Sequence, residues 1–230
     1  MIEIDWGMIW ETAPLLWRGA LLTLQITGVA VALGMLFGVV LAVAAVSPLP
    51  PLRWLAMSYI NFFRVIPKVM ILLWFYLVVP QVVANLLNLA PETDIRLISA
   101  ITAFVIFESS FYAEIFRAGL NSVPRSQAKA ALALGMTRSQ VMLLVLLPQA
   151  FRNMIPVLLT HSIVIFQDSS LVYIIGLGDF FRTSANLGKN AGLYPGLVLF
   201  AGGMYFIACF LASQTVDYLK RRVALKKLRA

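Results

Sequence analysis

Residues 21–46 read LLTLQITGVAVALGMLFGVVLAVAAV and contain no charged side chain. A helix needs about 20 mostly apolar residues to cross the hydrocarbon layer of a bilayer, which is about 30 Å thick. This segment exceeds that length, and a chain that spans lipid must satisfy its backbone hydrogen bonds internally. The stretch therefore predicts a transmembrane helix and an all-α integral membrane fold.

Four further segments have the length and hydropathy of spans, so we expect five transmembrane helices in total. Their ranges are 55–79, 97–116, 154–175 and 194–216. Pro67 and Pro156 predict kinks in the second and fourth spans. A weaker apolar stretch, residues 141–151, is too short to cross and contains Pro148, which predicts an interfacial or buried helix.

The composition of the whole chain excludes a soluble protein. Of its 230 residues, 61% are hydrophobic and 12% are charged, and the mean hydropathy is +0.89. Soluble domains carry about 25% charged residues, and one soluble core could not hide so much apolar surface. The lone Cys209 cannot form an internal disulfide, and we expect a small buried side chain there.

The net charge of +8 is interpreted as a topology signal, because lysines and arginines collect in the cytoplasmic loops of membrane proteins. With an extracytoplasmic N-terminus, twelve of the 18 basic residues fall on the cytoplasmic side: Arg53, Arg117, Arg125, Lys129, Arg138, Arg152, Lys220, Arg221, Arg222, Lys226, Lys227 and Arg229. This distribution predicts that orientation, in which residues 220–230 form a basic cytoplasmic tail next to the lipid bilayer. Nucleic-acid binding is not expected.

A polar stretch with its own helix signals, NSVPRSQAKAALALGMTRSQ, covers residues 121–140. Pro124 suits a first helical turn, the alanine-rich run favours helix, and Gly135 supplies a left-handed residue that ends it. Thr137 and Gln140 match a capping box for a second helix. The pattern predicts a short helix with small side chains, which is either a docking helix for a partner or a plain amphipathic connector.

Four ionisable residues lie inside the predicted spans, where charge is costly and usually faces a cavity or the bundle interior. They are Arg64, Lys68, Glu108 and Asp168. Asn61, Arg64 and Lys68 stand three, four and seven positions apart, which places them on one face of a continuous helix. A positive face with a neutral amide suits a dicarboxylic amino acid, because a guanidinium grips a carboxylate with two hydrogen bonds.

Structural alternatives exist for each of these charges. Arg64 can form an ion pair with Glu108 or Glu114, and Lys68 can pair or extend its long stem towards an interface. A polar group in the fourth span comprises Gln167, Asp168, Ser169 and Ser170. This group either lines a cavity, where the carboxylate binds a substrate ammonium, or makes hydrogen bonds between helices.

No metal site or catalytic centre is expected. His161 has no Cys, Asp or second His at ligand spacing, which predicts a packed, hydrogen-bonded histidine. The sequence also has no P-loop, GxSxG or HExxH motif, so the chain itself should not hydrolyse ATP.

Motifs in chain order are similar to those of ABC-importer permeases. Residues 127–136, followed by Leu147-Pro148-Gln149-Ala150, resemble the cytoplasmic coupling motif named for its Glu-Ala-Ala core. The motifs that resemble polar amino acid permeases, and the glutamate/aspartate importers in particular, are YINFFRVIP (59–67), LWFY (73–76), DIRLIS (94–99), 107–119, FQDSSLVY (166–173) and DFFRT (179–183). The resemblance covers about residues 19–219.

This resemblance implies a type I ABC-importer permease fold. The permease domain would cover residues 19–219, with a coupling loop at about 117–152, between an extracytoplasmic segment 1–18 and the tail 220–230. Implied partners are a sister permease subunit, or a second copy of this chain, two ATP-binding subunits and a periplasmic solute-binding protein in the bacterial inner membrane. ATP and Mg would be used by the partner ATPase, and this chain would bind no cofactor.

The family pattern also assigns individual residues. Those on the coupling motif are Gln127, Lys129, Ala130, Ala131 and Gly135. Lys129 replaces the acidic residue of the motif, so that the ATPase carries a complementary acid or the lysine faces water. Asn61 stands where permeases for cationic amino acids often have an acid, which favours an acidic substrate. Lys68 replaces the usual apolar residue.

The sequence therefore predicts a permease subunit that imports an acidic or polar amino acid by alternating access coupled to a partner ATPase. Glutamate and aspartate are favoured, and glutamine or another polar amino acid is the alternative. A stand-alone ion-coupled carrier, or a membrane enzyme that uses Glu108, Glu114 and Asp168 as acid and base groups, is a less favoured reading because neither an inverted repeat nor a nucleophile is visible.

Overall fold

The computed structural model describes residues 4–87 and 94–228, and all regular structure in these ranges is helical. The elements are α1 (Trp6–Glu11), α2 (Ala13–Ala45), α3 (Pro50–Val65), α4 (Lys68–Leu87), α5 (Arg96–Asn121), α6 (Arg125–Ala133), α7 (Arg138–Gln140), the π-helical η1 (Val141–Leu146), α8 (Leu147–Asp168), the 3₁₀ segment η2 (Ser169–Ile175), α9 (Phe180–Asn190) and α10 (Tyr194–Leu228). The predicted all-α fold is confirmed.

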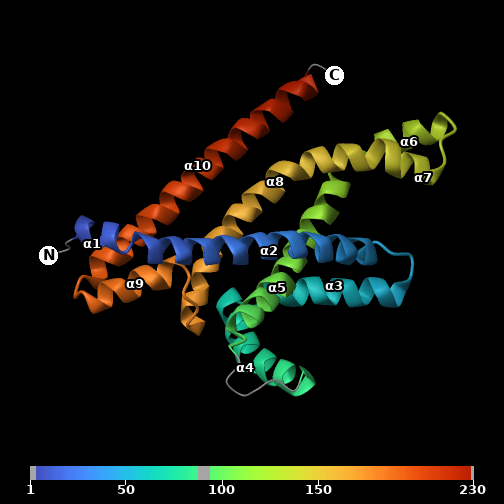
Figure 1. Ribbon diagram of the computed structural model, residues 1–230. Coiled ribbons are helices and arrows are strands. Elements are labelled where there is room, and N and C mark those ends of the chain that lie inside the picture. Colours follow the sequence, from blue (N-terminus) through green and yellow to red (C-terminus); the bar gives the residue numbers. More distant parts are fainter. Residues whose placement is uncertain (1–3, 88–93, 229–230) are drawn as a thin grey trace.

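Helices α2 and α5 form the most extensive pair and cross at the centre of the molecule (Figure 1). Two glycines of α2 permit this close approach. A Cβ atom on Gly38 would lie 2.5 Å from Cβ of Tyr112, and one on Gly34 would lie 3.2 Å from Cβ of Glu108. Small residues are the usual means by which membrane helices bring their backbones together. The contact buries Tyr112 and Glu108 completely.

The second span is not one kinked helix but two helices. Helix α3 ends at Val65, α4 begins at Lys68, and their axes bend by 107°. Pro67 explains the break, because proline has no N–H to donate and disfavours helical dihedral angles in the residue before it. Ile66 accordingly has extended angles, with φ −81° and ψ 135°. Arg64 and Lys68 therefore stand on opposite sides of a break.

Residues 141–151, predicted as an interfacial or buried helix, are helical but do not form a helix of their own. In the structure η1 and α8 continue without interruption from α7, so that residues 138–175 form one long helical run. Pro148 lies in the first turn of α8, where its missing N–H does not interrupt a hydrogen bond within that helix. The stretch is thus an extension of the fourth span.

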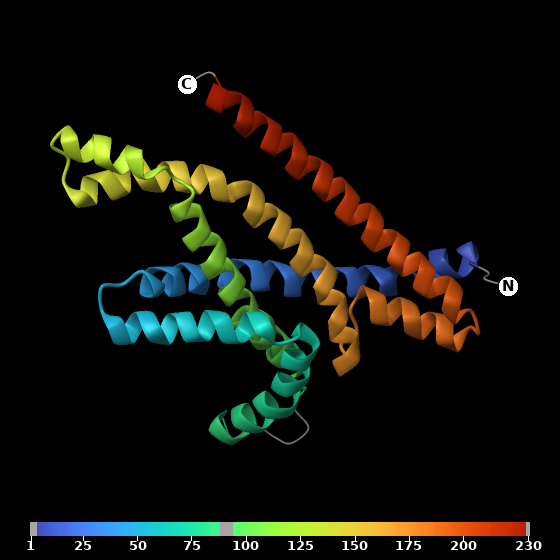
Figure 2. The ribbon, with the colours of Figure 1, turned by 180° about the vertical axis from the view of Figure 1, so that it is seen from behind.

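Helix α9 was not expected from the sequence, and α10 runs beyond the predicted fifth span. Within the described residues, four helical runs other than α3 and α4 are long and apolar enough to cross a membrane. The bent pair of α3 and α4 can supply a fifth span. In both views α1 and α9 lie at one end of the molecule, whereas α6 and the last turns of α10 lie towards the other (Figures 1 and 2). Large exposed apolar side chains, among them Phe37, Val43, Phe206 and Leu211, suit contact with lipid.

Candidate functional site

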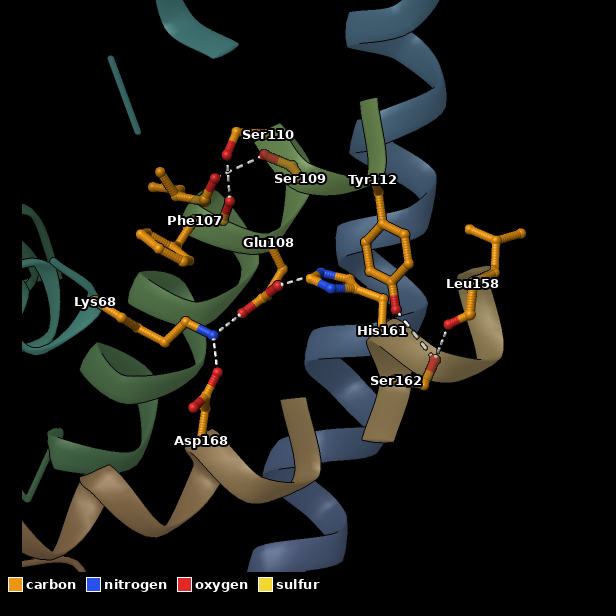
Figure 3. A network of polar contacts seen from close by, with 11 residues as sticks. Lys68, Phe107, Glu108, Ser109, Ser110, Tyr112, Leu158, His161, Ser162 and Asp168 are labelled. Atoms are coloured by element: carbon orange, nitrogen blue, oxygen red, sulfur yellow. Dashed lines mark hydrogen bonds and ion pairs between the residues drawn. The ribbon is translucent and has the colours of Figure 1, made fainter. Parts of the chain in front are cut away.

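The interior of the helix bundle holds a buried carboxylate. Glu108, on α5, has no solvent exposure. Its Oε1 lies 2.6 Å from Nζ of Lys68, and its Oε2 lies 2.8 Å from Nε2 of His161 (Figure 3). A carboxylate beside a lysine can only accept a hydrogen bond, so Nε2 of His161 donates one. Two partners thus compensate a charge that would be costly to bury alone.

Lys68 joins this carboxylate to a second one. It is the first residue of α4, directly after the helix break, and its Nζ donates a hydrogen bond to Oδ2 of Asp168 at the end of α8 (Figure 3). The side chain of Lys68 is 15% exposed and that of Asp168 is 30% exposed. The lysine therefore links α4, α5 and α8 inside the membrane.

Aromatic rings of α5 enclose these charges. Nζ of Lys68 lies 4.9 Å from the ring centroid of Phe107, and a cation near a ring face is attracted by the negative face of the π-system. The ring of Phe111 lies 5.1 Å from that of Phe107 and stacks on His161 at 5.5 Å. These rings limit the access of water to the Lys68–Glu108 pair and so strengthen it.

Arg64, on α3, forms a second and looser ion pair with Glu114, which follows Glu108 by six residues on α5. Its Nη1 lies 3.6 Å from Oε2 of Glu114, and its guanidinium carbon lies 5.9 Å from the ring centroid of Phe111. Glu114 is held more firmly by Arg117, which donates two hydrogen bonds of 3.0 and 2.6 Å. Arg64 is 39% exposed. It thus keeps donors available for another group.

Helix α6 and the sharp turn after it lie at one end of the molecule (Figure 1). Helix α6 follows Pro124, and Gly135 adopts the left-handed φ of 83° that ends it. The side chain of Gln140 accepts a hydrogen bond from the Thr137 N–H at 2.8 Å, and the Thr137 hydroxyl oxygen accepts one from the Gln140 N–H at 3.3 Å. The predicted helix, glycine stop and capping box are confirmed.

At the opposite end, a buried aspartate begins α9. Asp179 has no solvent exposure, and its carboxylate accepts hydrogen bonds from the N–H groups of Phe181 and Arg182 at 3.1 and 3.0 Å. Burial raises the pKa of Asp179 to about 6, although the two N–H groups act in the other direction. The N–H of Phe180 donates to the Thr23 hydroxyl at 3.1 Å, which ties α9 to α2.

Comparison with known proteins identifies the family. The family model for the binding-protein-dependent transport system inner membrane component matches residues 34–225. The chain belongs to this family. It is therefore a multi-pass permease subunit of the inner membrane, not an enzyme, and it acts in an ATP-driven importer together with ATPase and binding-protein subunits.

Individual relatives agree with this assignment. The permease is 53% identical over 224 residues to the glutamate/aspartate import permease protein GltK of Escherichia coli O6:H1, covering 97% of this chain and 100% of that protein. It is 30% identical to the arginine transport system permease protein ArtQ of Bacillus subtilis, covering 96% and 98% of the two chains. The crystal structure of an amino acid ABC transporter with histidines superposes with a TM-score of 0.85 at 29% identity, covering 96% and 99%.

The structure separates the predicted substrate-path residues of the permease into groups. Lys68, Glu108 and Asp168 meet in one ionic cluster. Asn61 and Arg64 share α3, but the single face predicted for Asn61, Arg64 and Lys68 is wrong because the helix breaks before Lys68. For Arg64 the alternative of an ion pair with Glu114 is observed, and for Lys68 the alternative of pairing is observed.

The remaining polar residues of the fourth span point elsewhere. Gln167 lines a groove of about 540 Å³ between α8 and α10, together with Cys209 and Tyr205. The hydroxyls of Ser169 and Ser170 donate to backbone carbonyls three residues earlier, at 2.7 and 2.8 Å. Asp168 alone of this group joins the cluster with Lys68. Cys209 is buried, as expected.

His161 is packed and hydrogen-bonded, as predicted, but its partner could not be found from the sequence. Glu108 and His161 lie on different helices, 53 positions apart, and no spacing rule joins them. Tyr112 was also missed, and its hydroxyl forms a 3.2 Å hydrogen bond with that of Ser162, the residue after His161 on α8 (Figure 3). The only available signal was that each polar side chain in a span needs a partner.

Proposed function

We propose that this permease imports an acidic amino acid, glutamate or aspartate, by alternating access driven by a partner ATPase. One observation carries the proposal: two cations within the membrane lie over neighbouring aromatic rings, Lys68 over Phe107 and Arg64 over Phe111, with ring centroids 5.1 Å apart. Such a pair can receive both carboxylates of a short dicarboxylate. The relative named for glutamate/aspartate import, at 53% identity, supports the same substrate class.

The substrate path would run along the polar residues of α3, the α3–α4 break, α5 and the end of α8. It comprises Asn61, Arg64, Lys68, Glu108 and Asp168, whereas Gln167, Ser169 and Ser170, which the sequence also placed on it, lie at the groove with α10 or donate to backbone carbonyls. Asn61 is exposed on α3, one turn before Arg64, and contributes a neutral amide. Helix α4 begins at Lys68, and the unpaired N–H groups at the start of a broken membrane helix favour anionic groups of a substrate.

Helix α6 is the proposed contact with the ATPase. Gln127, Lys129 and Ala130 are exposed on it, whereas Ala131 is buried. Leu134, at its end, is 84% exposed, which is unusual for a leucine and supports coverage by a partner. An acidic residue on the ATPase would complement Lys129. The assembly would contain two ATP-binding subunits, a sister permease, and a periplasmic binding protein. This chain itself would bind no cofactor, since ATP and Mg belong to the ATPase.

The proposed orientation has a periplasmic N-terminus and a cytoplasmic C-terminus. The position of α1 and α9 at one end, and of α6 towards the other, supports an odd number of crossings (Figure 2). Single cysteines introduced at the exposed positions Glu11 and Ser139, in a Cys209→Ala background, test it in intact cells. A membrane-impermeant maleimide should label the first and spare the second, and the reverse pattern would overturn the orientation.

The test of function is reconstitution of the permease in proteoliposomes with its sister permease, ATPase and binding protein. Glutamate or aspartate should stimulate ATP hydrolysis. Either amino acid should be taken up only when ATP is supplied to the ATPase subunits. Stimulation by arginine but not glutamate would overturn the acidic substrate, and stimulation by glutamine alone would identify a neutral one. Uptake driven by an ion gradient without ATP would overturn the proposal that import is coupled to a partner ATPase.

A further inference from the structure

The two carboxylates that share Lys68 differ in how firmly they are held. Glu108 is completely buried, and its second oxygen accepts the hydrogen bond of His161. Its Cβ is confined by the Gly34 contact of α2, where an added Cβ would lie 3.2 Å away. Withdrawal of Lys68 would leave the buried Glu108 carboxylate with His161 as its remaining partner. Glu108 is therefore a fixed counter-ion.

Asp168 is held by much less. Its side chain is 30% exposed, and it meets Lys68 from the last residue of α8. The chain continues from Asp168 into the 3₁₀ segment η2, whose hydrogen bonds are weaker than those of an α-helix. Asp168 can therefore leave Lys68 at little cost.

We propose that Asp168 is a stand-in for the side-chain carboxylate of the cargo. In the resting permease the Asp168 carboxylate accepts the hydrogen bond of Lys68 Nζ. An arriving glutamate exchanges its side-chain carboxylate for Asp168 on Nζ, while Glu108 stays in place. The released Asp168 then receives the cargo ammonium, and Arg64 takes the remaining carboxylate. This assignment rests on the proposed function, that the cargo is an acidic amino acid.

The charges around Lys68 favour an exchange of carboxylates over binding of the cargo without release of Asp168. Both carboxylates already contact the Lys68 ammonium, so a third carboxylate that merely approached it would meet the charges of Glu108 and Asp168. Exchange removes that obstacle, because each charge on the cargo then faces an opposite charge of the chain. Arg64 is suited to the last contact, since its 3.6 Å contact with Glu114 is long and Arg117 already satisfies that carboxylate.

The exchange predicts that one variant changes the affinities for two ligands differently. Asp168→Asn removes the competitor for Lys68 and also the partner of the ammonium. Glutarate, which has two carboxylates and no ammonium, should bind about tenfold more tightly to the variant, the factor that corresponds to one charge-assisted contact. Glutamate should gain no such advantage, so the ratio of glutarate to glutamate affinity should rise.

Binding is measured on the assembled permease pair with its ATPases in lipid nanodiscs, without binding protein, by competition against radiolabelled glutamate. Asp217→Asn is the matched control, because it removes a carboxylate from the exposed Asp217–Lys220 pair on α10. It should leave both affinities unchanged. Asp168→Glu should restore the wild-type ratio, and assembly with the ATPases confirms that each variant folds.

Three results would overturn the exchange. If Asp168→Asn weakened the binding of glutarate and of glutamate equally, Asp168 would be a structural residue only. If the variant changed neither affinity, Asp168 would lie outside the site. A wild-type complex that imports glutamate but does not bind it in this assay would exclude cargo on Lys68. A complex that imports arginine and not glutamate would instead overturn the proposed function.

Discussion

Replacing Lys68 by methionine tests whether the ionic cluster stabilises the fold. Methionine keeps a flexible stem of similar length but removes the ammonium that lies 2.6 Å from Oε1 of Glu108. Breaking a buried ion pair by removing one partner costs about 3–5 kcal/mol, because the other charge stays buried and uncompensated. Here His161 still donates to Glu108, so we expect about 3 kcal/mol, the lower end of that range.

The assay is equilibrium unfolding of the purified permease in detergent, followed by the loss of helical signal. Lys220→Met is the matched control, since Lys220 pairs with Asp217 at 3.1 Å and both side chains are about half exposed. An exposed pair contributes about 0–1 kcal/mol, so this variant should change the free energy of unfolding little. The double variant Lys68→Met with Glu108→Gln should recover part of the loss, because the completely buried Glu108 side chain then carries no charge.

Two outcomes would refute the reasoning. A Lys68→Met variant no less stable than Lys220→Met would mean that Glu108 does not depend on the lysine. A double variant that loses the sum of the two single losses would mean that the residues do not act as a pair. Either outcome would also remove the fixed counter-ion from the proposed exchange.

Three further predictions concern the packing and the two ends of the bundle. Gly38→Val should destabilise the permease by about 1–3 kcal/mol in the same unfolding assay, because the added Cβ would lie 2.5 Å from Tyr112. Since burial raises the pKa of Asp179 to about 6, above its ordinary 3.8, ionisation is disfavoured in the folded state. Its contribution to stability should fall by about 2 kcal/mol as pH rises from 4 to 7, and Asp179→Asn, which still caps the helix, should abolish that part of the pH dependence of the melting temperature. Gly135→Pro cannot adopt a φ of 83°, so it should abolish substrate-stimulated ATP hydrolysis while the permease still reaches the membrane; intact hydrolysis would contradict the docking role of α6.

Local signals in the sequence located the ends of the helices that carry them. Pro124, Gly135 and the Thr137–Gln140 box each act within one turn, and the structure has all three as expected. Among the described residues, hydropathy likewise located the four helices that are long and apolar enough to span, because the requirement of about 20 apolar residues acts along one segment. Hydropathy did not predict that the fourth helical run begins at residue 138, well before the predicted span 154–175. A single helix there carries both a span and its extension, and composition does not mark where lipid ends.

The site was predictable only as a set of residues and not as an arrangement. Charge inside the spans singled out Arg64, Lys68, Glu108 and Asp168, and all four take part in ion pairs. Helical spacing then placed Lys68 with Asn61, and this was wrong because Pro67 turns the chain by 107° instead of kinking it. A proline limits the local dihedral angles, but the packing around the break sets the angle.

What the sequence by itself determined is the membrane fold, the family and the positions at which charge enters the bilayer. These follow from free energies that act on one residue or one turn: transfer of apolar side chains to lipid, capping, and the cost of a charge in hydrocarbon. Only the tertiary structure decided that Glu108 is shared by Lys68 and His161, and that Lys68 also reaches Asp168. These residues come from three helices, and each can be satisfied by several partners. The close packing of α2 on α5, which glycines permit and no local rule specifies, selects among them.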